Sequence, residues 1–353
     1  MKRQETVLQR IEIGSLLDVS FEKLLKTTFQ NSKIAILVDE HTNAYCLDLL
    51  ITNFSQLSKA EIIQIPAGEE NKDIEICVQL WQTLSEYQFG KKDLLINLGG
   101  GMITDLGGFV ASVYKRGMSF INVPTSLLAM VDAAIGGKNG IDFNSVKNQL
   151  GAIQFPECTF IDPSFLQTLP EVEVKNGFAE IIKHALIADA ALWSEIQLMD
   201  SDFRFDSKII QHAVKIKMDI VNRDPFETGE RKLLNFGHTI GHGLEGAFCE
   251  THHLAHGHAV AIGMIGEAYI SMRMGFLKQE YFNDIQKLIL AIFEPIENMH
   301  SSTELILKLM HQDKKNEINK INCSLLKGIG SASYDNFIEE ALLLETLNYL
   351  GTL

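Results

Sequence analysis

Cysteine is scarce in this sequence, and the few cysteines are scattered. The five of them, Cys46, Cys77, Cys158, Cys249 and Cys323, are odd in number and form no C-x-x-C pair. A disulfide framework or a zinc knuckle is therefore not expected, and a reducing compartment is favoured.

Long apolar runs and basic charge are also in short supply. No apolar run approaches the ~20 residues that span a bilayer, and residues 1–6 lead into no apolar segment of signal-peptide length. Lys and Arg number 31 against 45 Asp and Glu, so the formal net charge is −14. A chain this acidic repels phosphate backbones and anionic lipids, which argues against nucleic acid and membranes as partners. We expect a cytoplasmic protein in which a small anionic substrate would need a local cluster of Lys and Arg.

Apart from these deficits, the composition is that of a globular protein longer than one core. The 353 residues are 46% hydrophobic and 22% charged, and they favour two domains. Short apolar runs predict buried parallel strands at 33–39, 60–66, 93–98 and 119–123, with a helix at 73–87. Helical patterns dominate later, at 174–190, 207–222, 233–248 and 259–274. The predicted fold is an α/β domain at 1–170, with a parallel sheet covered on both faces, followed by a mostly helical domain at 171–353.

A glycine-rich segment, LGGGMITDLGG at 98–108, follows one predicted strand and opens a helix. Glycines at such a place let the backbone approach a pyrophosphate, although a tight turn is the plainer interpretation. The segment is not the G-x-G-x-x-G fingerprint, because Thr104 occupies the last glycine position. Asp39 ends the first predicted strand, where an acid can hold a ribose hydroxyl, and residues 66–72 follow the second. Together the three segments predict a dinucleotide groove.

Histidine is concentrated in one short stretch, since six of the eleven fall between His238 and His258. Asn235, His238 and His242 stand at i, i+3 and i+7 and are expected to share one helix face. The i, i+4 spacing of His238 and His242 could bring both to one metal ion. The zinc hydrolase motif H-E-x-x-H is absent, because Thr239 stands where it requires Glu.

Two further residues extend this into a candidate metal site. His256 opens the next predicted helix and could supply a second imidazole. Glu180 is a candidate carboxylate, because Lys183 and His184 follow it at i+3 and i+4 and make one face of an apolar helix polar. A catalytic zinc needs about three protein ligands and an open position. The alternative interpretation is a solvated helix face together with surface histidines.

Lysines and arginines form a candidate anion site. Lys138 and Lys147 occupy glycine-flanked, loop-like positions near the predicted sheet edge. Each basic residue alone is an ordinary surface charge, but as a set in an acidic protein they could hold a phosphate and a carboxylate. The set is Arg116, Lys138, Lys147, Lys217, Arg231, Lys314 and Lys315.

These motifs, in this order, resemble those of the 3-dehydroquinate synthases, within the wider sugar phosphate cyclases. The resemblance extends through nearly the whole chain. Its motifs are PAGEENK (66–72), GGGMITDLGGFVA (99–111), YKRG (114–117), PTSLLAMVD (124–132), GGK (136–138), KN (147–148), GFAEIIKHALI (177–187), LLNFGHTIGH (233–242), HGHAVAIGM (256–264) and DKK (313–315). One departure is His258, which stands where the family usually has Glu.

The resemblance implies an N-terminal Rossmann-like NAD-binding domain, a helical metal- and substrate-binding domain, and a homodimer. It implies a carbon–oxygen lyase of the shikimate pathway, which serves chorismate and aromatic amino acid biosynthesis. Such enzymes convert 3-deoxy-D-arabino-heptulosonate 7-phosphate to 3-dehydroquinate and phosphate by transient oxidation, phosphate elimination, reduction and intramolecular aldol closure. NAD is regenerated in each turnover, and Zn²⁺ or Co²⁺ polarises a substrate hydroxyl.

The resemblance also implies roles for individual residues. Glu180, His238 and His256 would hold the metal, and His242 would face the substrate, which replaces the ligand role suggested by spacing. The other substrate-side residues would be Asp132, Lys138, Asn148, Lys183, Lys217, Arg231, Asn235 and Lys314 or Lys315, with Arg116 reaching across from a second subunit. NAD would be held by Asp39, Glu69, Lys72, Gly99, Gly100, Gly101, Asp105, Thr125, Ser126, Lys138, Lys147 and Thr168.

Two rival classes share much of this pattern. Another sugar phosphate cyclase, such as a deoxyinosose or valiolone synthase, would alter the groups that read the carboxylate and the phosphate. Here Lys217, Arg231 and Asn235 stand as in dehydroquinate synthases. A metal- and NAD-dependent polyol dehydrogenase shares the architecture, but it would accumulate NADH.

Overall fold

The computed structural model describes residues 9–144, 146–199, 207–252, 254–297, 299–311 and 321–353. The chain divides into two compact units. The first comprises Met1–Val174 and Arg204–Val214, and the second comprises Lys175–Phe203 and Lys215–Leu353. Among the described residues, the helices are all too short or too polar to cross a membrane.

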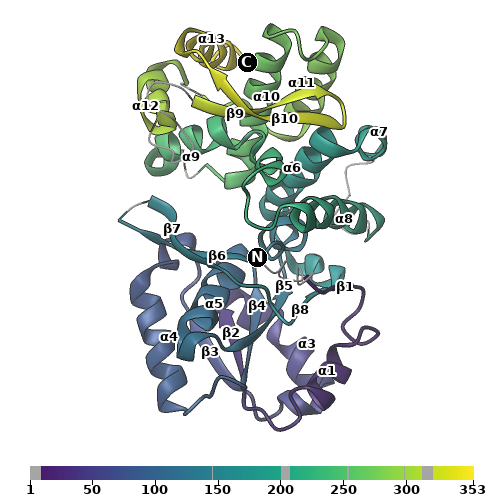
Figure 1. Ribbon diagram of the computed structural model, residues 1–353, viewed down its shortest axis with the longest axis vertical. Helices are drawn as coiled ribbons and strands as arrows, with labels where there is room; N and C mark the ends of the chain where they lie inside the picture. Colours follow the sequence, from purple (N-terminus) through teal and green to yellow (C-terminus); the bar gives the residue numbers. More distant parts are fainter. Residues whose placement is uncertain (1–8, 145, 200–206, 253, 298, 312–320) are drawn as a thin grey trace, which may run out of the picture. The chain divides into compact units, whose positions relative to one another are not determined.

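The first unit is built on a six-stranded parallel sheet (Figure 1). Its strands stand in the order β1-β8-β5-β4-β2-β3, and all neighbouring pairs run parallel. The bounds are β1 Ile11–Ile13, β2 Ile34–Asp39, β3 Glu61–Ile65, β4 Leu94–Gly99, β5 Ser119–Pro124 and β8 Cys158–Ile161. The four strands predicted from apolar runs are confirmed as β2, β3, β4 and β5. β1 and β8 were not predicted, because three and four residues are too few to show a pattern.

Helices cover both faces of this sheet. On one face, α4 (Ile74–Glu86) and α5 (Gly101–Val113) share a hydrophobic core with Leu37, Leu95 and Phe120. On the other face, Phe21 of α1 (Phe21–Thr27) packs edge-on against Phe160 of β8, with ring centroids 5.1 Å apart. Two short helices, α2 (Glu40–Tyr45) and α3 (Leu47–Asn53), follow β2. The predicted parallel sheet with two covered faces is confirmed.

A separate antiparallel hairpin in this unit comprises β6 (Lys138–Phe143) and β7 (Val146–Ile153). Lys138 begins β6 and Lys147 lies in β7, so the prediction that both occupy loops is wrong. The paired glycines of the hairpin explain the error. A Cβ on Gly151 would lie 2.6 Å from the backbone oxygen of Asn139, so the strands require glycine at a position where sequence patterns indicate a turn.

The second unit is mostly helical, as predicted. α10 (His256–Arg273) is central, because every residue from Ala259 to Ala268 is buried. It packs against α9, α11, α13 and β9. The other helices are α6 (Glu171–Ala188), α7 (Ala190–Gln197), α8 (Ser207–Arg223), α9 (His238–His252), α11 (Gln279–Ile292), α12 (Met299–His311) and α13 (Glu340–Leu350), of which α6 and α8 are shared with the first unit. An antiparallel hairpin, β9 (Ile321–Gly328) and β10 (Ser331–Ile338), was not predicted.

α9 begins at His238, later than the helix predicted at 233–248. Residues Glu230–Asn235 form a 3₁₀ helix, and Gly237 then has a left-handed φ of +81°. A Cβ at Gly237 would lie 2.5 Å from Met264 Cγ, so only glycine lets the chain pass this close to α10. The prediction that Asn235 shares a helix face with His238 and His242 is therefore wrong.

Candidate active site

Three candidate metal ligands come together in the second unit, each from a different helix. Glu180 lies in the middle of α6, His238 is the first residue of α9, and His256 is the first residue of α10. One ligand atom from each lies within 4.8 Å of the others. Glu180 is fully buried, whereas 29% of the His256 side chain is exposed. The cluster therefore has a buried carboxylate and an imidazole that solvent can reach.

Backbone and side-chain acceptors orient the two imidazoles. His238 Nδ1 lies 3.3 Å from the carbonyl oxygen of Phe236, which can only accept a hydrogen bond. In the neutral ring the proton therefore sits on Nδ1, and the lone pair of Nε2 lies 3.6 Å from Glu180 Oε1. His256 Nδ1 lies 3.3 Å from Oε2 of Glu245, so the neutral His256 ring also carries its proton on Nδ1.

The surroundings of Glu180 suit a bound cation. In the described part of the chain, neither carboxylate oxygen of Glu180 accepts a hydrogen bond, although Lys183 forms an ion pair with it. A buried carboxylate is paired with a cation or coordinates a metal, and Lys183 pairs with Oε2 of Glu180, while Oε1 faces His238. Two ligands at about 2.0–2.1 Å from a tetrahedral zinc stand about 3.4 Å apart, close to the 3.6 Å found between Glu180 and His238. The residues present therefore fit a divalent metal of the zinc type.

His242 belongs to a second, overlapping group. The ring centroids of His238 and His242 are 5.3 Å apart. His242 nevertheless falls into a candidate group with Glu245 and His256, and among the described residues no such group holds both His238 and His242. The geometry thus gives no support to one metal shared by the i, i+4 pair.

A buried glutamate that the sequence did not reveal fixes the start of α9. Glu267 of α10 accepts backbone N–H groups from Gly237 at 2.8 Å, Thr239 at 3.0 Å and Ile240 at 3.3 Å. Gly237 precedes the helix and has no side chain, so it cannot cap these N–H groups at the start of α9. The signal in the sequence was a single acid inside the apolar stretch of α10. Its role depends on which helix packs beside it, and the sequence does not show that.

Arg231 is buried and held by its own loop. Its backbone N–H donates to Asp224 Oδ2 at 3.0 Å, and its Nη1 donates to the carbonyl of Pro225 at 2.7 Å. Asp224 also accepts N–H groups from Thr228 and Gly229. Burial alone would raise the pKa of Asp224, but these backbone donors outweigh it and hold the pKa below its usual value. The loop therefore presents a guanidinium in a fixed place.

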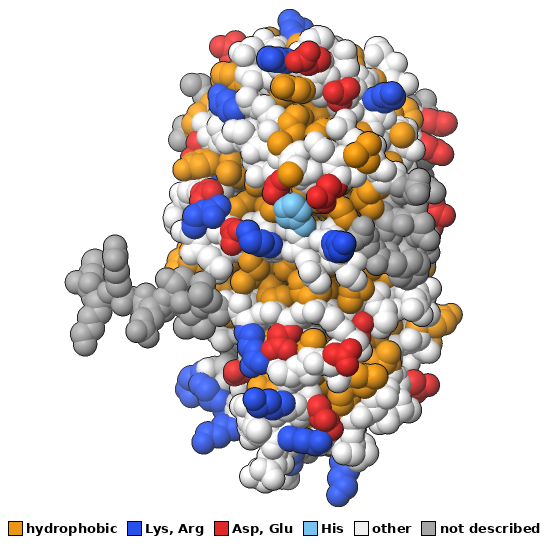
Figure 2. All heavy atoms as spheres, turned by 90° about the vertical axis from the view of Figure 1, so that its right-hand side faces the viewer, with side chains coloured by type: hydrophobic (Ala, Val, Ile, Leu, Met, Phe, Trp, Pro, Cys, Tyr) orange, Lys and Arg blue, Asp and Glu red, His pale blue; other side chains and the backbone are white. Residues whose placement is uncertain are grey.

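The other substrate-side candidates of the second unit are also mostly buried. Lys183 and Lys217 are 1% and 5% exposed, which is rare for lysine. Asn235 donates to Glu227 Oε1 at 2.8 Å, whereas His242 is exposed. On the face drawn in Figure 2, by contrast, Lys and Arg are interspersed with Asp and Glu. In the second unit, the described cationic candidates Lys183, Lys217 and Arg231 are therefore buried side chains.

In the first unit, the glycine segment lies where the strand order of the sheet reverses. The chain moves outward from β2 to β3, and then returns to place β4 on the other side of β2. Ligands of such sheets bind at this point, beyond the carboxyl ends of the strands. Gly99 ends β4, and Gly100 precedes the first turn of α5. A Cβ on Gly100 would lie 3.3 Å from Ser126 Oγ, and Thr125 N–H donates to Gly99 O at 3.0 Å.

Asp39 ends β2 on the other side of this reversal. Its Oδ1 accepts the backbone N–H of Thr42 at 2.7 Å and the Thr42 hydroxyl at 3.0 Å, so the carboxylate caps α2. The predicted position at the sheet edge is found, and the side chain also has this local structural task.

Lys72 is the centre of a buried polar group at the same edge. Its Nζ donates to Asp105 Oδ2 at 2.7 Å and to Asn148 Oδ1 at 2.8 Å, and it lies 3.5 Å from Glu69. Burial acts to lower the pKa of Lys72, but the carboxylates of Asp105 and Glu69 outweigh it, so the pKa is raised. Asn148, which the resemblance assigns to the substrate, thus lies among residues that it assigns to NAD.

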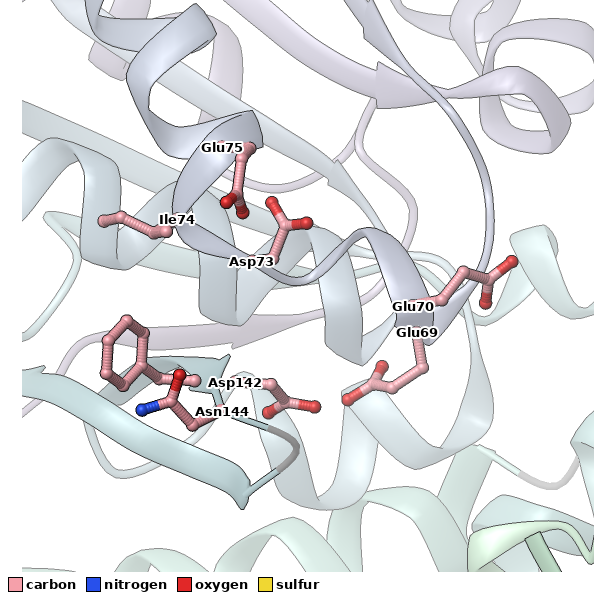
Figure 3. Close-up of a pocket in the computed structure, with 8 residues that line it drawn as sticks. Glu69, Glu70, Asp73, Ile74, Glu75, Asp142 and Asn144 are labelled. Atoms are coloured by element: carbon pink, nitrogen blue, oxygen red, sulfur yellow. The ribbon is translucent and has the colours of Figure 1, made fainter. Parts of the chain in front are cut away.

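Beside Lys72, a pocket of about 370 Å³ is strongly acidic. Its lining includes Glu69, Glu70, Asp73, Glu75 and Asp142, and the carboxylates of Glu69 and Asp142 point toward one another (Figure 3). Burial raises the pKa of Asp142. A phosphate would be repelled here, so this pocket is not the predicted pyrophosphate site.

The remaining predicted residues are exposed, half-buried or outside the described part of the chain. Arg116 is exposed with a left-handed φ of +61°, and Lys138 and Lys147 are exposed. Asp132 is half-buried, and the Thr168 hydroxyl donates to the carbonyl of Phe165 at 3.4 Å in a 3₁₀ helix. His258 Nε2 lies 2.6 Å from the carbonyl oxygen of Glu294. Lys314 and Lys315 lie outside the described residues.

The fold and the Glu-His-His cluster define a class of enzyme that joins a parallel α/β unit to a helical unit carrying candidate metal ligands. Within this class, the chain belongs to the 3-dehydroquinate synthase family. The family models described as 3-dehydroquinate synthase N-terminal and C-terminal match residues 62–176 and 177–316.

Curated relatives match over nearly the whole length. A 3-dehydroquinate synthase of Parabacteroides distasonis is 38% identical over 327 residues, which cover 92% of this chain and 92% of the relative. The 3-dehydroquinate synthase of Clostridium acetobutylicum is 35% identical over 344 residues, covering 96% and 95%.

Solved structures show the same fold at lower identity. The 2-epi-5-epi-valiolone synthase of Streptomyces hygroscopicus subsp. jinggangensis, with NAD⁺ and Zn²⁺ bound, has a TM-score of 0.86 at 24% identity, covering 100% of this chain and 99% of that chain. A 2-deoxy-scyllo-inosose synthase has a TM-score of 0.84 at 22% identity, covering 96% of each.

Proposed function

We propose that this chain converts 3-deoxy-D-arabino-heptulosonate 7-phosphate to 3-dehydroquinate and phosphate, as a carbon–oxygen lyase of the shikimate pathway. The observation that carries the proposal is the cluster of Glu180, His238 and His256 within 4.8 Å, in a chain both of whose halves match the models of one family. Zn²⁺ or Co²⁺ would occupy this cluster, and the donor set of two imidazoles and one carboxylate leaves a position open for a substrate oxygen.

When bound, the metal would polarise a substrate hydroxyl and NAD would take up and return a hydride. The chain's own contribution is binding and orientation. Arg231 would meet the substrate carboxylate, because its planar cation is buried and anchored by Pro225. Lys217 would act as a buried point charge, and Lys183, beside Glu180, would orient a substrate oxygen near the metal. Asn235, His242, Asp132, Asn148 and Lys314 or Lys315 complete the proposed substrate side.

NAD would bind at the reversal of strand order in the first unit. The start of α5, at Gly100 and Gly101, offers backbone N–H groups to the pyrophosphate. Support comes from the related valiolone synthase, whose structure holds NAD⁺ and Zn²⁺, and from a 2-deoxy-scyllo-inosose synthase complexed with carbaglucose-6-phosphate, NAD⁺ and Co²⁺. The acidic pocket lined by Glu69 repels phosphate, so the pyrophosphate would bind outside it.

The proposal has an organisational part. Residues 1–170 would serve NAD, and residues 171–353 would serve metal and substrate. The active form would be a cytoplasmic homodimer in which Arg116 of one subunit reaches the site of the other. Arg116 is exposed, which such a role requires.

The test is phosphate release from the heptulosonate phosphate by the purified protein, with and without NAD and with and without a chelator. Phosphate and 3-dehydroquinate should form in equal amounts, should need both NAD and metal, and should leave no net NADH. Accumulation of NADH in an amount equal to that of the product would identify a dehydrogenase instead. Equal turnover of a heptose phosphate that lacks the carboxylate would identify another sugar phosphate cyclase.

A further inference from the structure

The packing of α9 on α10 is closest along a row of glycines. Gly237, directly before α9, is so close to Gly263 of α10 that no Cβ fits on Gly263, and a Cβ on Gly241 of α9 would lie 3.1 Å from Val260 Cα. One turn forward along α9 thus corresponds to about one turn backward along α10, so the two helices run antiparallel. Continuing this register by one more turn in each helix pairs position 245 with position 256.

That pairing is observed. Glu245 is 8% exposed, and its Oε2 lies 3.3 Å from Nδ1 of His256. An ionised carboxylate can only accept, so the neutral His256 ring carries its proton on Nδ1 and keeps the lone pair on Nε2. Histidines that bind metals commonly donate their other N–H to a carboxylate, which fixes both tautomer and ring orientation.

We infer that Glu245 is a positioning residue, which holds the ring of His256 in the tautomer and orientation that metal binding requires. The inference rests on the proposed function, because it presupposes a metal on Glu180, His238 and His256. It assigns a task to a residue that does not belong to this ligand set.

A competing role for Glu245 is direct ligation, since Glu245, His242 and His256 also have ligand atoms within 4.8 Å of one another. The hydrogen bonding favours the positioning role. Glu245 Oε2 faces Nδ1 of His256, the nitrogen that carries the proton, whereas Glu180 Oε1 faces the Nε2 lone pair of His238, and Lys183 pairs with the other oxygen of Glu180. Two facing acceptors need a cation between them, so a metal ion fits between Glu180 and His238 better than it fits at Glu245.

The experiment compares three variants of the full chain with the unmodified protein. Glu245→Gln keeps the size of the side chain but weakens the acceptor. Glu180→Gln shows the effect of losing a ligand. Glu280→Gln removes the same charge from an exposed position on α11 and is the matched control. Zinc affinity is measured by competition with a chelator, and the tautomer of His256 is measured by ¹⁵N NMR on metal-free protein.

For Glu245→Gln we expect zinc affinity to fall about 10–100-fold and the His256 signals to shift toward a mixture of tautomers. Glu280→Gln should match the unmodified protein in both. Unchanged affinity and tautomer in Glu245→Gln would overturn the inference. A loss as large as that of Glu180→Gln would overturn it too, because Glu245 would then be a ligand. If the unmodified protein takes up no zinc, the proposed function fails at its metal site.

Discussion

Replacing Glu267 by alanine is expected to destabilise the second unit through the start of α9. The buried carboxylate accepts N–H groups from Gly237 at 2.8 Å, Thr239 at 3.0 Å and Ile240 at 3.3 Å. Each hydrogen bond to a charged group contributes about 1.5–3 kcal/mol, but one side chain serves all three, so the values do not add. Removing the carboxylate leaves buried N–H groups without this acceptor, at about 1–3 kcal/mol for each that stays unsatisfied, so we expect the free energy of unfolding to fall by about 3–5 kcal/mol in Glu267→Ala.

Thermal unfolding of metal-free protein measures this loss without the contribution of a bound ion. For a unit of this size, 3–5 kcal/mol corresponds to a decrease in Tm of roughly 6–20 °C. Glu267→Gln keeps one acceptor oxygen and should lose less. Glu280→Ala, at an exposed position, should change stability by no more than about 0.5 kcal/mol. A loss below about 1 kcal/mol in Glu267→Ala would refute the reasoning, because the three N–H groups would then not depend on the carboxylate.

Three further predictions concern the same unit. His238→Ala should lose its metal and keep its fold, so elemental analysis that finds full metal occupancy would contradict the ligand assignment. Arg231→Ala should lower turnover of the heptulosonate phosphate by about one to two decades, as expected for a lost charged hydrogen bond of about 1.5–3 kcal/mol, and should leave NAD and zinc binding intact; turnover at the unmodified rate would remove Arg231 from the site. The lowered pKa of Asp224 means that its ionised form contributes stability above the unfolded-state pKa, and that this stability is lost as pH falls through the folded-state pKa. Asp224→Asn should therefore be less stable at pH 7 but lose less on acidification, which urea midpoints at several pH values would show; parallel pH curves would rule this out.

The parts of the fold that were predictable are those in which local pattern and tertiary burial agree. β2 and β4 are buried along nearly their whole length, so they are apolar runs in the sequence. The hairpins are the opposite case. β7 is largely exposed, and β6 and β7 pair through glycines, so neither shows an alternating pattern. β9 and β10 meet at Gly328 and Gly330, both with positive φ, and this glycine turn was the one signal that could have revealed them.

The candidate site was predictable to the extent that each residue stands out against its own element. Glu180 is a carboxylate in the middle of an apolar helix, and His256 opens a helix, so both were visible from residue type and place. Glu245 and Glu267 were not, because each acts on a neighbouring helix, and nothing in one sequence sets the register between helices. The exact start of α9 was missed for the same reason, because the close contact of Gly237 with α10 determines where the helix begins.

The relative placement of the three candidate ligands depends on contacts between helices. α6 contributes in two ways, because it carries Glu180 and also contacts the start of α10. Glu180 lies one turn after Asn176 on α6, and the Asn176 side chain accepts the backbone N–H of Gly257, the second residue of α10. A Cβ on Gly257 would run into the backbone of Asn176, so this approach requires glycine. The helix that provides the carboxylate therefore also fixes the start of the helix that provides His256. Because these contacts involve no ligand atom, the three ligands are held together before any metal binds, and the entropy of assembling them is lost in folding and not in binding.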